Sequence, residues 1–376
     1  MSSRTARESA ERILVRCPNW LGDVVMATPG LRALRRAHPE AWIVAQLPLG
    51  LIPLLEGSGY CDELWPIVPR SSGLGALRAE ARRVAQFRFD RGVLIPESIS
   101  SALRMRWGRV PRIVGFARDP FRRLLLTEEV PAPSDWGARR LVSRERFVVG
   151  LMEALGAAPT TDLRLGLCVT RDEEARLEVA LAKHGLGLAA LDRDRPVVLA
   201  PGASFGASKC WPPEYYAELA DRFAARGRRV ILLGGPGEGA LLARVRGQME
   251  SKPVVLDGVL DLGGLKALLR STKLLIANDA GARHVAAAFG VPSVIFLGPT
   301  SLEKTADNLD QIEILEREFD CRPCYKRNCP IDHRCLRMIT VEDADAAASR
   351  ALERGGDSKR EVPVLQGGAG AGGAES

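Results

Sequence analysis

The feature that most constrains the fold of this chain is an alternation of short apolar runs with amphipathic segments. Such alternation is typical of βα units, which build a parallel sheet covered by helices. It occurs in both halves of the chain and therefore predicts two α/β domains. The expected strands are residues 12–17, 42–47, 63–68 and 91–95 in the first half and 197–200, 229–233, 254–256, 274–277 and 293–297 in the second. The first half also predicts helices over 24–37, 74–88 and 139–155, with a kink or a short irregular turn at Pro29.

A capping-box pattern marks the junction between the two halves. Thr170 and Glu173 predict the start of a helix over residues 171–184, Gly185 predicts its end, and 185–196 is expected to be a connection. We therefore expect a flexible N-terminus at 1–11, an N-terminal domain at 12–185, a C-terminal domain at 186–355 and a disordered tail at 356–376. Ligands of parallel sheets bind beyond the carboxyl ends of the strands, so a cleft between the domains is the expected site.

Composition excludes several classes of protein. Lys and Arg number 53 against 46 Asp and Glu, and a net charge of +7 over 376 residues does not by itself argue for nucleic acid. The first twelve residues are polar and lack the apolar core of a signal peptide. Glycine and proline interrupt the longest uncharged runs, so no transmembrane helix is predicted. We expect a soluble, cytoplasmic protein.

The first candidate site follows the first expected strand, in the sequence Asn19-Trp20-Leu21-Gly22-Asp23. Gly22 permits a tight turn, and Asp23 then stands near the start of a helix, where the helix dipole stabilises a carboxylate. Asp23 is therefore either a general base in the cleft or only the N-cap of that helix.

The second candidate site is the segment 201–209, which follows a strand. Small residues, including Gly202 and Ser204, permit close approach of a ligand to the backbone, and Lys209 supplies a positive charge for phosphate. The segment is not a Walker A motif, because no glycine precedes the lysine. The alternative is an exposed loop lysine without a ligand.

Two further strand ends carry acidic residues. Glu238, in the glycine cluster 234–239, is suited to ribose hydroxyls, or it is only an acid in the first turn of a helix. Asp279, in the segment 278–284, either caps a helix or binds a sugar hydroxyl, while the backbone N–H groups at that helix start suit a diphosphate. His284 is either part of this site or a packed helix residue.

Four cysteines lie within fifteen residues near the end of the chain. Their spacing favours a closed structural zinc site, with disulfides and free thiols as the alternatives. Four thiolate ligands would leave no open position on the metal, so a catalytic role for it is not expected. The four are Cys321, Cys324, Cys329 and Cys335, with His333 nearby.

An arginine-rich stretch occupies residues 104–123, where Asp119 is the only acid. It is either a solvated face or a docking surface for an anionic glycolipid or membrane. Nucleic acid is less favoured, because few aromatic residues accompany the arginines and no RNA-binding motif is present. The arginines are Arg104, Arg106, Arg109, Arg112, Arg118, Arg122 and Arg123.

Taken together, these segments resemble the ADP-heptose–lipopolysaccharide heptosyltransferases (glycosyltransferase family 9), and most closely those that add the second heptose. The resemblance covers about residues 12–350. It rests on NWLGDVVMATPGLRALR (19–35), PGASFGASKCWP (201–212), LLGGPGE (232–238), NDAGARHVAAAFGVPSVIFLGPT (278–300) and the cysteine segment CRPCYKRNCPIDHRC (321–335).

The resemblance implies a GT-B fold, in which two Rossmann-like domains with parallel sheets face an interdomain cleft. The N-terminal domain would bind the acceptor and the C-terminal domain the donor. By motif position, Asp23 would be the general base, Lys209 would hold the diphosphate and Glu238 would bind the adenosine ribose. Asp279 and Gly281 would contact the heptose or the phosphates. Gly202, Ser204 and His284 complete the expected donor site, and Asn19, Trp20, Arg104, Arg106 and Arg109 form the expected acceptor site.

The implied activity is inverting transfer of L-glycero-D-manno-heptose from ADP-heptose to the inner core of lipopolysaccharide, onto heptosyl-Kdo2-lipid A. No catalytic cofactor is expected, and no nucleic acid partner. The lipid A-core acceptor would place the protein peripherally at the inner membrane. The alternatives are a family member with another nucleotide sugar or surface-glycan acceptor, and a non-catalytic, zinc-stabilised module that binds RNA or membranes.

Overall fold

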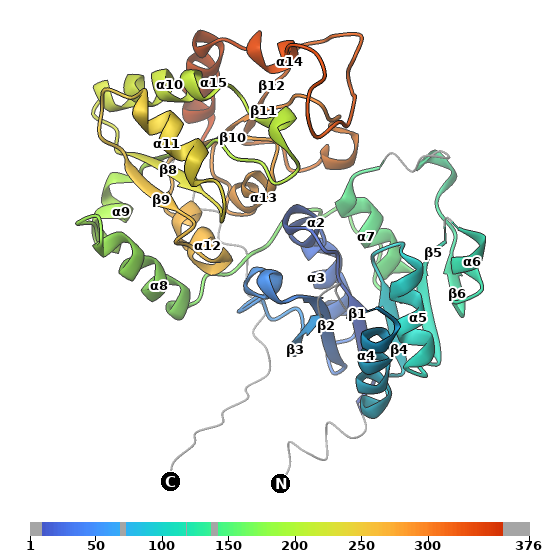
Figure 1. Cartoon of the computed structure of the whole chain (residues 1–376). Helices are drawn as coiled ribbons and strands as arrows, with labels where there is room; N and C mark the ends of the chain where they lie inside the picture. Colours follow the sequence, from blue (N-terminus) through green and yellow to red (C-terminus); the bar gives the residue numbers. More distant parts are fainter. Residues whose placement is uncertain (1–9, 68–72, 118, 137–141, 356–376) are drawn as a thin grey trace, which may run out of the picture. The chain divides into compact units, whose positions relative to one another are not determined.

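The computed structural model describes residues 10–67, 73–117, 119–136 and 142–355 and divides them into two compact units (Figure 1). The N-terminal unit ends at Cys168, and the C-terminal unit begins at Val169. The predicted boundary at 185 is therefore wrong. Helix α8 (Arg171–Ala182) packs on α12 (Leu262–Arg270) of the C-terminal unit. The predicted tail at 356–376 and residues 1–9 of the predicted flexible N-terminus lie outside the described residues.

The N-terminal unit contains a six-stranded sheet whose neighbouring strands are all parallel, in the order β3-β2-β1-β4-β5-β6. The four predicted strands are confirmed, whereas β5 and β6 lie in and beyond the arginine stretch and were not predicted. The strands are β1 (Arg12–Arg16), β2 (Trp42–Pro48), β3 (Glu63–Ile67), β4 (Arg91–Leu94), β5 (Arg112–Phe116) and β6 (Glu128–Val130).

The predicted helices 24–37, 74–88 and 139–155 are present, although residues 139–141 lie outside the described residues, whereas η1, α5, α6 and η3 were not predicted. The kink at Pro29 is confirmed as a division into two helices, because Pro29 lies in the first turn of the second. The helices are α2 (Leu21–Met26), α3 (Thr28–Ala37), η1 (Leu49–Leu54), α4 (Gly73–Phe87), α5 (Ile99–Trp107), α6 (Pro120–Arg123), η3 (Ser134–Trp136) and α7 (Arg144–Glu153).

The C-terminal unit contains a second parallel six-stranded sheet, in the order β12-β11-β10-β7-β8-β9. Its five predicted strands are confirmed, and β12 was not predicted. The strands are β7 (Val197–Ala200), β8 (Val230–Gly234), β9 (Val254–Asp257), β10 (Leu274–Asn278), β11 (Ser293–Phe296) and β12 (Ile312–Leu315).

The capping box of Thr170 and Glu173 at the start of α8 is present, whereas the predicted connection at 185–196 contains a short helix, α9 (Leu188–Asp194). The other helices are η4 (Ala207–Lys209), α10 (Pro213–Ala225), α11 (Gly239–Gly247), α13 (Gly281–Ala288), η5 (Glu303–Thr305), α14 (Arg334–Arg337) and α15 (Val341–Arg354). In the described parts of the chain, no helix is long and apolar enough to cross a membrane.

Each unit has its own apolar core. In the N-terminal unit, Trp42, Trp65, Phe87 and Phe89 form an aromatic cluster beside the sheet. In the C-terminal unit, the fully buried Trp211 stacks on Phe296 with 4.1 Å between ring centroids. Burial of a side chain of this size contributes about 2–3 kcal/mol, so these rings fix the strands beneath them.

The strand order determines which loops meet. Because β7 and β10 are hydrogen-bonded neighbours in a parallel sheet, the loops after their carboxyl ends emerge side by side. These two loops carry Lys209 and Asp279. The fully buried Asn278 joins the loops, since its side-chain amide donates to the carbonyl of Pro201 (2.7 Å) and its side-chain oxygen accepts from the backbone N–H of Trp211 (2.9 Å).

Candidate functional site

Asp23 lies inside the first turn of α2 and does not cap it. The N-cap residue is Trp20, whose backbone is extended and whose side chain makes no capping hydrogen bond. The interpretation of Asp23 as an N-cap is therefore wrong. Gly22 is also helical, so the tight turn expected there is absent.

Asp23 faces a pocket of about 260 Å³ within the N-terminal unit. The guanidinium Nε of Arg144, the first residue of α7, lies 3.6 Å from Asp23 Oδ1. Asn19 and Trp20 share this pocket, and Trp20 is 60% exposed. The pocket thus combines a carboxylate that can accept a proton with a cation that can orient an anionic group. Its lining residues are Pro18, Asn19, Trp20, Asp23, Ile95, Pro96, Glu97, Ser98, Arg144, Phe147 and Val148.

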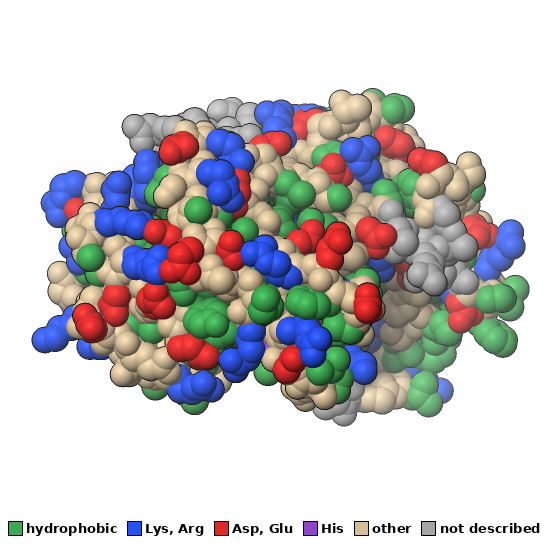
Figure 2. Space-filling view, turned by 90° about the horizontal axis from the view of Figure 1, so that it is seen from above, with side chains coloured by type: hydrophobic (Ala, Val, Ile, Leu, Met, Phe, Trp, Pro, Cys, Tyr) green, Lys and Arg blue, Asp and Glu red, His purple; other side chains and the backbone are tan. Residues whose placement is uncertain are grey.

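The arginine stretch does not form a continuous basic surface, because acidic residues from outside the stretch pair with several of its arginines. Arg104 pairs with the buried Glu80, and Arg122 is fully buried, where it donates to the carbonyls of Phe116 (2.9 Å) and Ser98 (2.7 Å). Arg112 and Arg123 pair with Glu128 and Glu129, and Asp119 caps α6. Arg106 and Arg109 are exposed, and Arg118 lies outside the described residues. On the face shown in Figure 2, basic and acidic side chains are interspersed.

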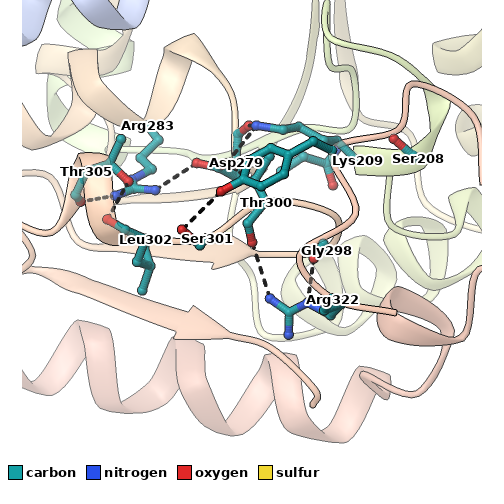
Figure 3. Close-up of polar contacts among 12 residues, drawn as sticks. Ser208, Lys209, Asp279, Arg283, Gly298, Thr300, Ser301, Leu302, Thr305 and Arg322 are labelled. Carbon is teal, nitrogen blue, oxygen red and sulfur yellow. Dashed lines mark hydrogen bonds and ion pairs between the residues drawn. The ribbon is translucent and has the colours of Figure 1, made fainter. Parts of the chain in front are cut away.

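Lys209 makes its contacts with the neighbouring strand end. Its Nζ donates to the carboxylate Oδ2 of Asp279 (2.6 Å) and to the backbone carbonyl of the same residue (2.8 Å), as Figure 3 shows. Both side chains are largely buried. The interpretation of Lys209 as an exposed loop lysine is therefore wrong, and the two predicted residues form one buried ion pair.

Asp279 is held by further donors. Arg283 NH1 lies 2.7 Å from Oδ1, and the Thr300 hydroxyl donates to Oδ2 (2.9 Å) (Figure 3). Burial alone would raise the pKa of Asp279, but the charges of Arg283 and Lys209 outweigh it and lower this pKa to about 2. The N-cap of α13 is Ala280, so Asp279 is not a helix cap. Two cations around one carboxylate leave an excess positive charge that suits an anion.

His284 is a packed helix residue. Its side chain is buried in α13, and burial together with the charge of Arg283 lowers its pKa to about 3. The imidazole is therefore neutral at pH 7. Gly281 is the first residue of the same helix, and Ser204 is exposed in the loop after β7.

Glu238 and Gly202 lie against each other. A Cβ atom at Gly202 would lie 2.0 Å from the carboxylate of Glu238, so any other residue there would displace that carboxylate. Glu238 is the N-cap residue of α11, but its side chain makes no capping hydrogen bond to that helix. Its Oε2 instead accepts a hydrogen bond from the N–H of Gly235 (2.8 Å). The remaining lone pairs of the carboxylate can accept hydrogen bonds from hydroxyl groups.

The four clustered cysteines do not form the predicted zinc site. All are free thiols, and no three His, Cys, Asp or Glu side chains within the described ranges could together hold a metal ion. Cys335 packs into the apolar core, whereas Cys321 is exposed, and the ring of His333 is engaged by the carbonyl of Ser208. The spacing was suitable, but in the described residues these side chains form no cluster that could hold a metal ion.

Sequence reasoning missed several partners of these residues. Arg283 follows Asp279 by four residues, which is a detectable helical spacing. Thr300 and Arg144 belong to segments without such a signal, and their contacts depend on the tertiary fold.

A family comparison identifies the chain. The model of glycosyltransferase family 9 (heptosyltransferase) matches residues 77–334. The chain belongs to this family. It is therefore a glycosyltransferase, and the alternative of a non-catalytic binding module is wrong.

Individual relatives agree with this assignment. Lipopolysaccharide heptosyltransferase 2 of Salmonella typhimurium is 29% identical over 309 residues, which cover 78% of this chain and 84% of the relative. The structure of the E. coli ADP-heptose lipopolysaccharide heptosyltransferase II superposes with a TM-score of 0.74 at 25% identity, covering 91% of this chain and 99% of that one. A family 9 glycosyltransferase from Veillonella parvula gives a TM-score of 0.78 at 25% identity, covering 91% and 97%. The fold class of this family 9 enzyme is GT-B, as predicted.

Proposed function

We propose that this family 9 enzyme transfers L-glycero-D-manno-heptose from ADP-heptose to the inner core of lipopolysaccharide, as the second heptose on heptosyl-Kdo2-lipid A. The names of its relatives support this donor and acceptor. The structural observation that carries the proposal is the cluster of Lys209, Arg283 and Asp279 at the carboxyl ends of β7 and β10. Its excess positive charge is suited to a nucleotide diphosphate.

In this proposal, the donor occupies the C-terminal unit. Lys209 exchanges part of its contact with Asp279 for the diphosphate, and Glu238 accepts hydrogen bonds from the ribose hydroxyls. Asp279 and Gly281 contact the heptose or the phosphates. Gly202 and Ser204 let the ligand approach the backbone of the loop after β7, while His284 supports the site as a neutral packed residue.

The acceptor occupies the pocket that contains Asp23. As the acceptor hydroxyl attacks the anomeric carbon, Asp23 takes its proton and the bond from that carbon to the ADP oxygen breaks. Attack opposite the leaving group inverts the anomeric configuration. Lys209 stabilises the charge that develops on the departing ADP, so the residues supply this stabilisation without a catalytic cofactor. Asn19 and Trp20 hold the acceptor at the rim of the pocket.

The test is the replacement of Asp23 by asparagine, which preserves size but cannot accept the proton at neutral pH. Turnover should fall by about 10²–10⁴-fold, the usual contribution of a positioned general base. ADP-heptose affinity should stay within about threefold of wild type, because the proposed donor residues belong to the other unit. Glu97 is another carboxylate that lines this pocket, so Glu97→Gln is the matched variant. Near-wild-type turnover in Asp23→Asn, or a larger loss in Glu97→Gln, would reject Asp23 as the base.

A lipid-linked acceptor also requires access to a membrane, and we propose that α6 provides it. Phe121 is 73% exposed and Leu124 is 80% exposed, and Arg123 lies between them in sequence. At the margin that carries α6 and β6, hydrophobic side chains lie beside both basic and acidic ones (Figures 1 and 2). Apolar side chains enter the lipid interface while arginines contact anionic headgroups. This surface supports our proposal that the protein associates peripherally with the inner face of the cytoplasmic membrane.

Sedimentation with anionic phospholipid vesicles tests this surface. Phe121→Ser with Leu124→Ser should reduce the vesicle-bound fraction several-fold and leave transfer to a water-soluble acceptor fragment unchanged. Val179→Ser with Val259→Ser is the control, since both valines are exposed in the C-terminal unit. Equal binding by the two double variants would place the membrane contact elsewhere.

A further inference from the structure

The cysteine-rich segment (321–335) contacts the loop that carries Lys209, although it does not bind metal in the way predicted. The contacts converge on Ser208, which is buried and precedes Lys209 directly. The backbone N–H of Ser208 donates to the carbonyl of Arg327 (3.0 Å), and its hydroxyl donates to the carbonyl of Lys326. His333 Nε2 donates to the carbonyl of Ser208 (2.7 Å). Every polar group of Ser208 is thus held by the cysteine-rich segment.

The same segment also forms hydrogen bonds to the loop that carries Thr300. The Arg322 side chain donates to the carbonyls of Gly298 (2.6 Å) and Thr300 (3.5 Å), as Figure 3 shows. The backbone N–H of Tyr325 donates to the carbonyl of Pro299 (2.9 Å), and the Tyr325 hydroxyl donates to the Ser301 hydroxyl (3.2 Å). Because the Thr300 hydroxyl donates to Asp279, these contacts also connect the cysteine-rich segment to Asp279, the acidic partner of Lys209.

The approach of the two backbones is close enough to exclude a side chain. Gly206 has φ +148°, and a Cβ atom there would lie 2.5 Å from the carbonyl oxygen of Arg327. Glycine is therefore required both for the backbone conformation and for the contact. A side chain at this position would separate the segment from the loop.

His333 itself adopts an unusual backbone conformation, with φ 62° in the left-handed region. That conformation is unfavourable for a residue other than glycine and persists where surrounding contacts compensate for it. A carbonyl oxygen can only accept, so His333 must present an N–H at Nε2 to Ser208.

We propose that the cysteine-rich segment positions Lys209 and Asp279 for the donor diphosphate, with His333 and Ser208 as its positioning residues. Neither residue needs to touch the substrate. They fix the backbone next to Lys209, so its ammonium is placed before the donor arrives and less ordering is required on binding. This inference rests on the proposed function for its kinetic consequence only.

The experiment compares His333→Gln with His333→Met in the full-length protein. Glutamine places an N–H donor near the position of Nε2, whereas methionine has similar size and no donor, and both adopt the same unfavourable φ. His333→Met should raise the KM for ADP-heptose about fivefold, the effect of one buried hydrogen bond, and leave the acceptor KM unchanged. His333→Gln should restore most of the donor KM.

Hydrogen exchange provides a readout independent of transfer. Amides of residues 203–209 should exchange about fivefold faster in His333→Met than in His333→Gln, with no change in β8. Ser208→Ala removes only the hydroxyl contact and should show the same local effect if the histidine variants fail to fold. Gly206→Ala should have a larger effect than Gly227→Ala, which has φ +71° and no neighbouring atom within 4 Å of its Cβ position.

Unchanged exchange of 203–209 in His333→Met, Ser208→Ala and Gly206→Ala would overturn the positioning role. If the KM for ADP-heptose rises in His333→Met and stays equally high in His333→Gln, the role of the His333 hydrogen bond would be overturned. Failure of the wild-type enzyme to release ADP from ADP-heptose with its acceptor would reject the proposed function instead, and the exchange results would still decide the positioning role.

Discussion

Replacing Asp279 with asparagine removes the negative charge from a buried cluster that holds two cations. Lys209 and Arg283 lie 2.6 and 2.7 Å from its carboxylate oxygens. Burial raises the pKa of this carboxyl, but Arg283 and Lys209 outweigh burial and lower the pKa from 3.8 to about 2. At 1.36 kcal/mol for each pKa unit, this lowering corresponds to about 2 kcal/mol. Asp279→Asn should therefore destabilise the C-terminal unit by about 2 kcal/mol at pH 7.

The pH dependence gives this prediction a sign. Because the pKa of Asp279 is lower in the folded chain, its stabilisation is fully present above the pKa of the unfolded chain and is lost as the pH falls toward about 2. The stability gap between wild type and Asp279→Asn should therefore be constant from pH 7 to about pH 5. It should shrink below about pH 4, to roughly half its size at pH 3.

Urea unfolding followed by fluorine NMR of fluorotryptophan-labelled protein measures this gap in the correct unit. Trp211 is the only tryptophan after residue 168 and is fully buried, and Trp211→Phe assigns its signal. Glu250→Gln removes an exposed carboxylate from the same unit and should change stability by less than about 0.5 kcal/mol. A gap below about 0.5 kcal/mol for Asp279→Asn at pH 7, or one that does not narrow at pH 3, would refute the reasoning.

Three further predictions concern binding. Lys209→Ala should weaken ADP binding and slow transfer. Lys209→Arg should restore only part of the affinity and of the rate, because a planar guanidinium does not reproduce a compact ammonium. If calorimetric titration finds the same ADP affinity in Lys209→Ala as in wild type, Lys209 does not belong to the phosphate site. Gly202→Ala should displace the Glu238 carboxylate and weaken ADP binding several-fold. Gly247→Ala, with no atom within 4 Å of its Cβ position, should bind ADP like wild type. Equal ADP affinities of Gly202→Ala and Gly247→Ala would contradict a role for Glu238. Arg106→Ala with Arg109→Ala should raise the acceptor KM more at low salt than at physiological salt and leave the donor KM unchanged. Arg112→Ala, whose native side chain pairs with Glu128, should not raise the acceptor KM. An acceptor KM that does not depend on ionic strength would show that Arg106 and Arg109 only face solvent.

The sequence predicted the central strands of both sheets because these strands are buried on both faces and read as continuous apolar runs. The edge strands β3 and β9 were also predicted, whereas the edge strands β6 and β12 and the inner strand β5 were not. Arg112 begins β5, and its neighbour β6 reads Glu-Glu-Val, so charged residues mask both. The edge strand β12 reads Ile-Glu-Ile-Leu, and four residues are too few for a clear pattern.

The sites show a similar division. Motifs identified Lys209 and Asp279 separately, but the pairing of β7 with β10 brings these residues into contact across 70 positions of sequence. Arg144 reaches its carboxylate partner from a helix that carries no motif, and Thr300 closes the motif 278–300 without any signal that its hydroxyl would contact Asp279. For the cysteines, the spacing predicted a zinc site that the structure does not form. Spacing along a chain does not determine the direction of side chains, and Cys335 packs into the core.

The boundary between Cys168 and Val169 has an evolutionary consequence. Each side of it retains a complete six-stranded sheet, so recombination between related genes at this point interrupts no strand ladder. The proposed donor residues all follow the boundary, and the proposed base and its pocket all precede it. Under this arrangement, a lineage can acquire a new acceptor by exchanging the first half of the gene while it inherits nucleotide-sugar preference intact with the second.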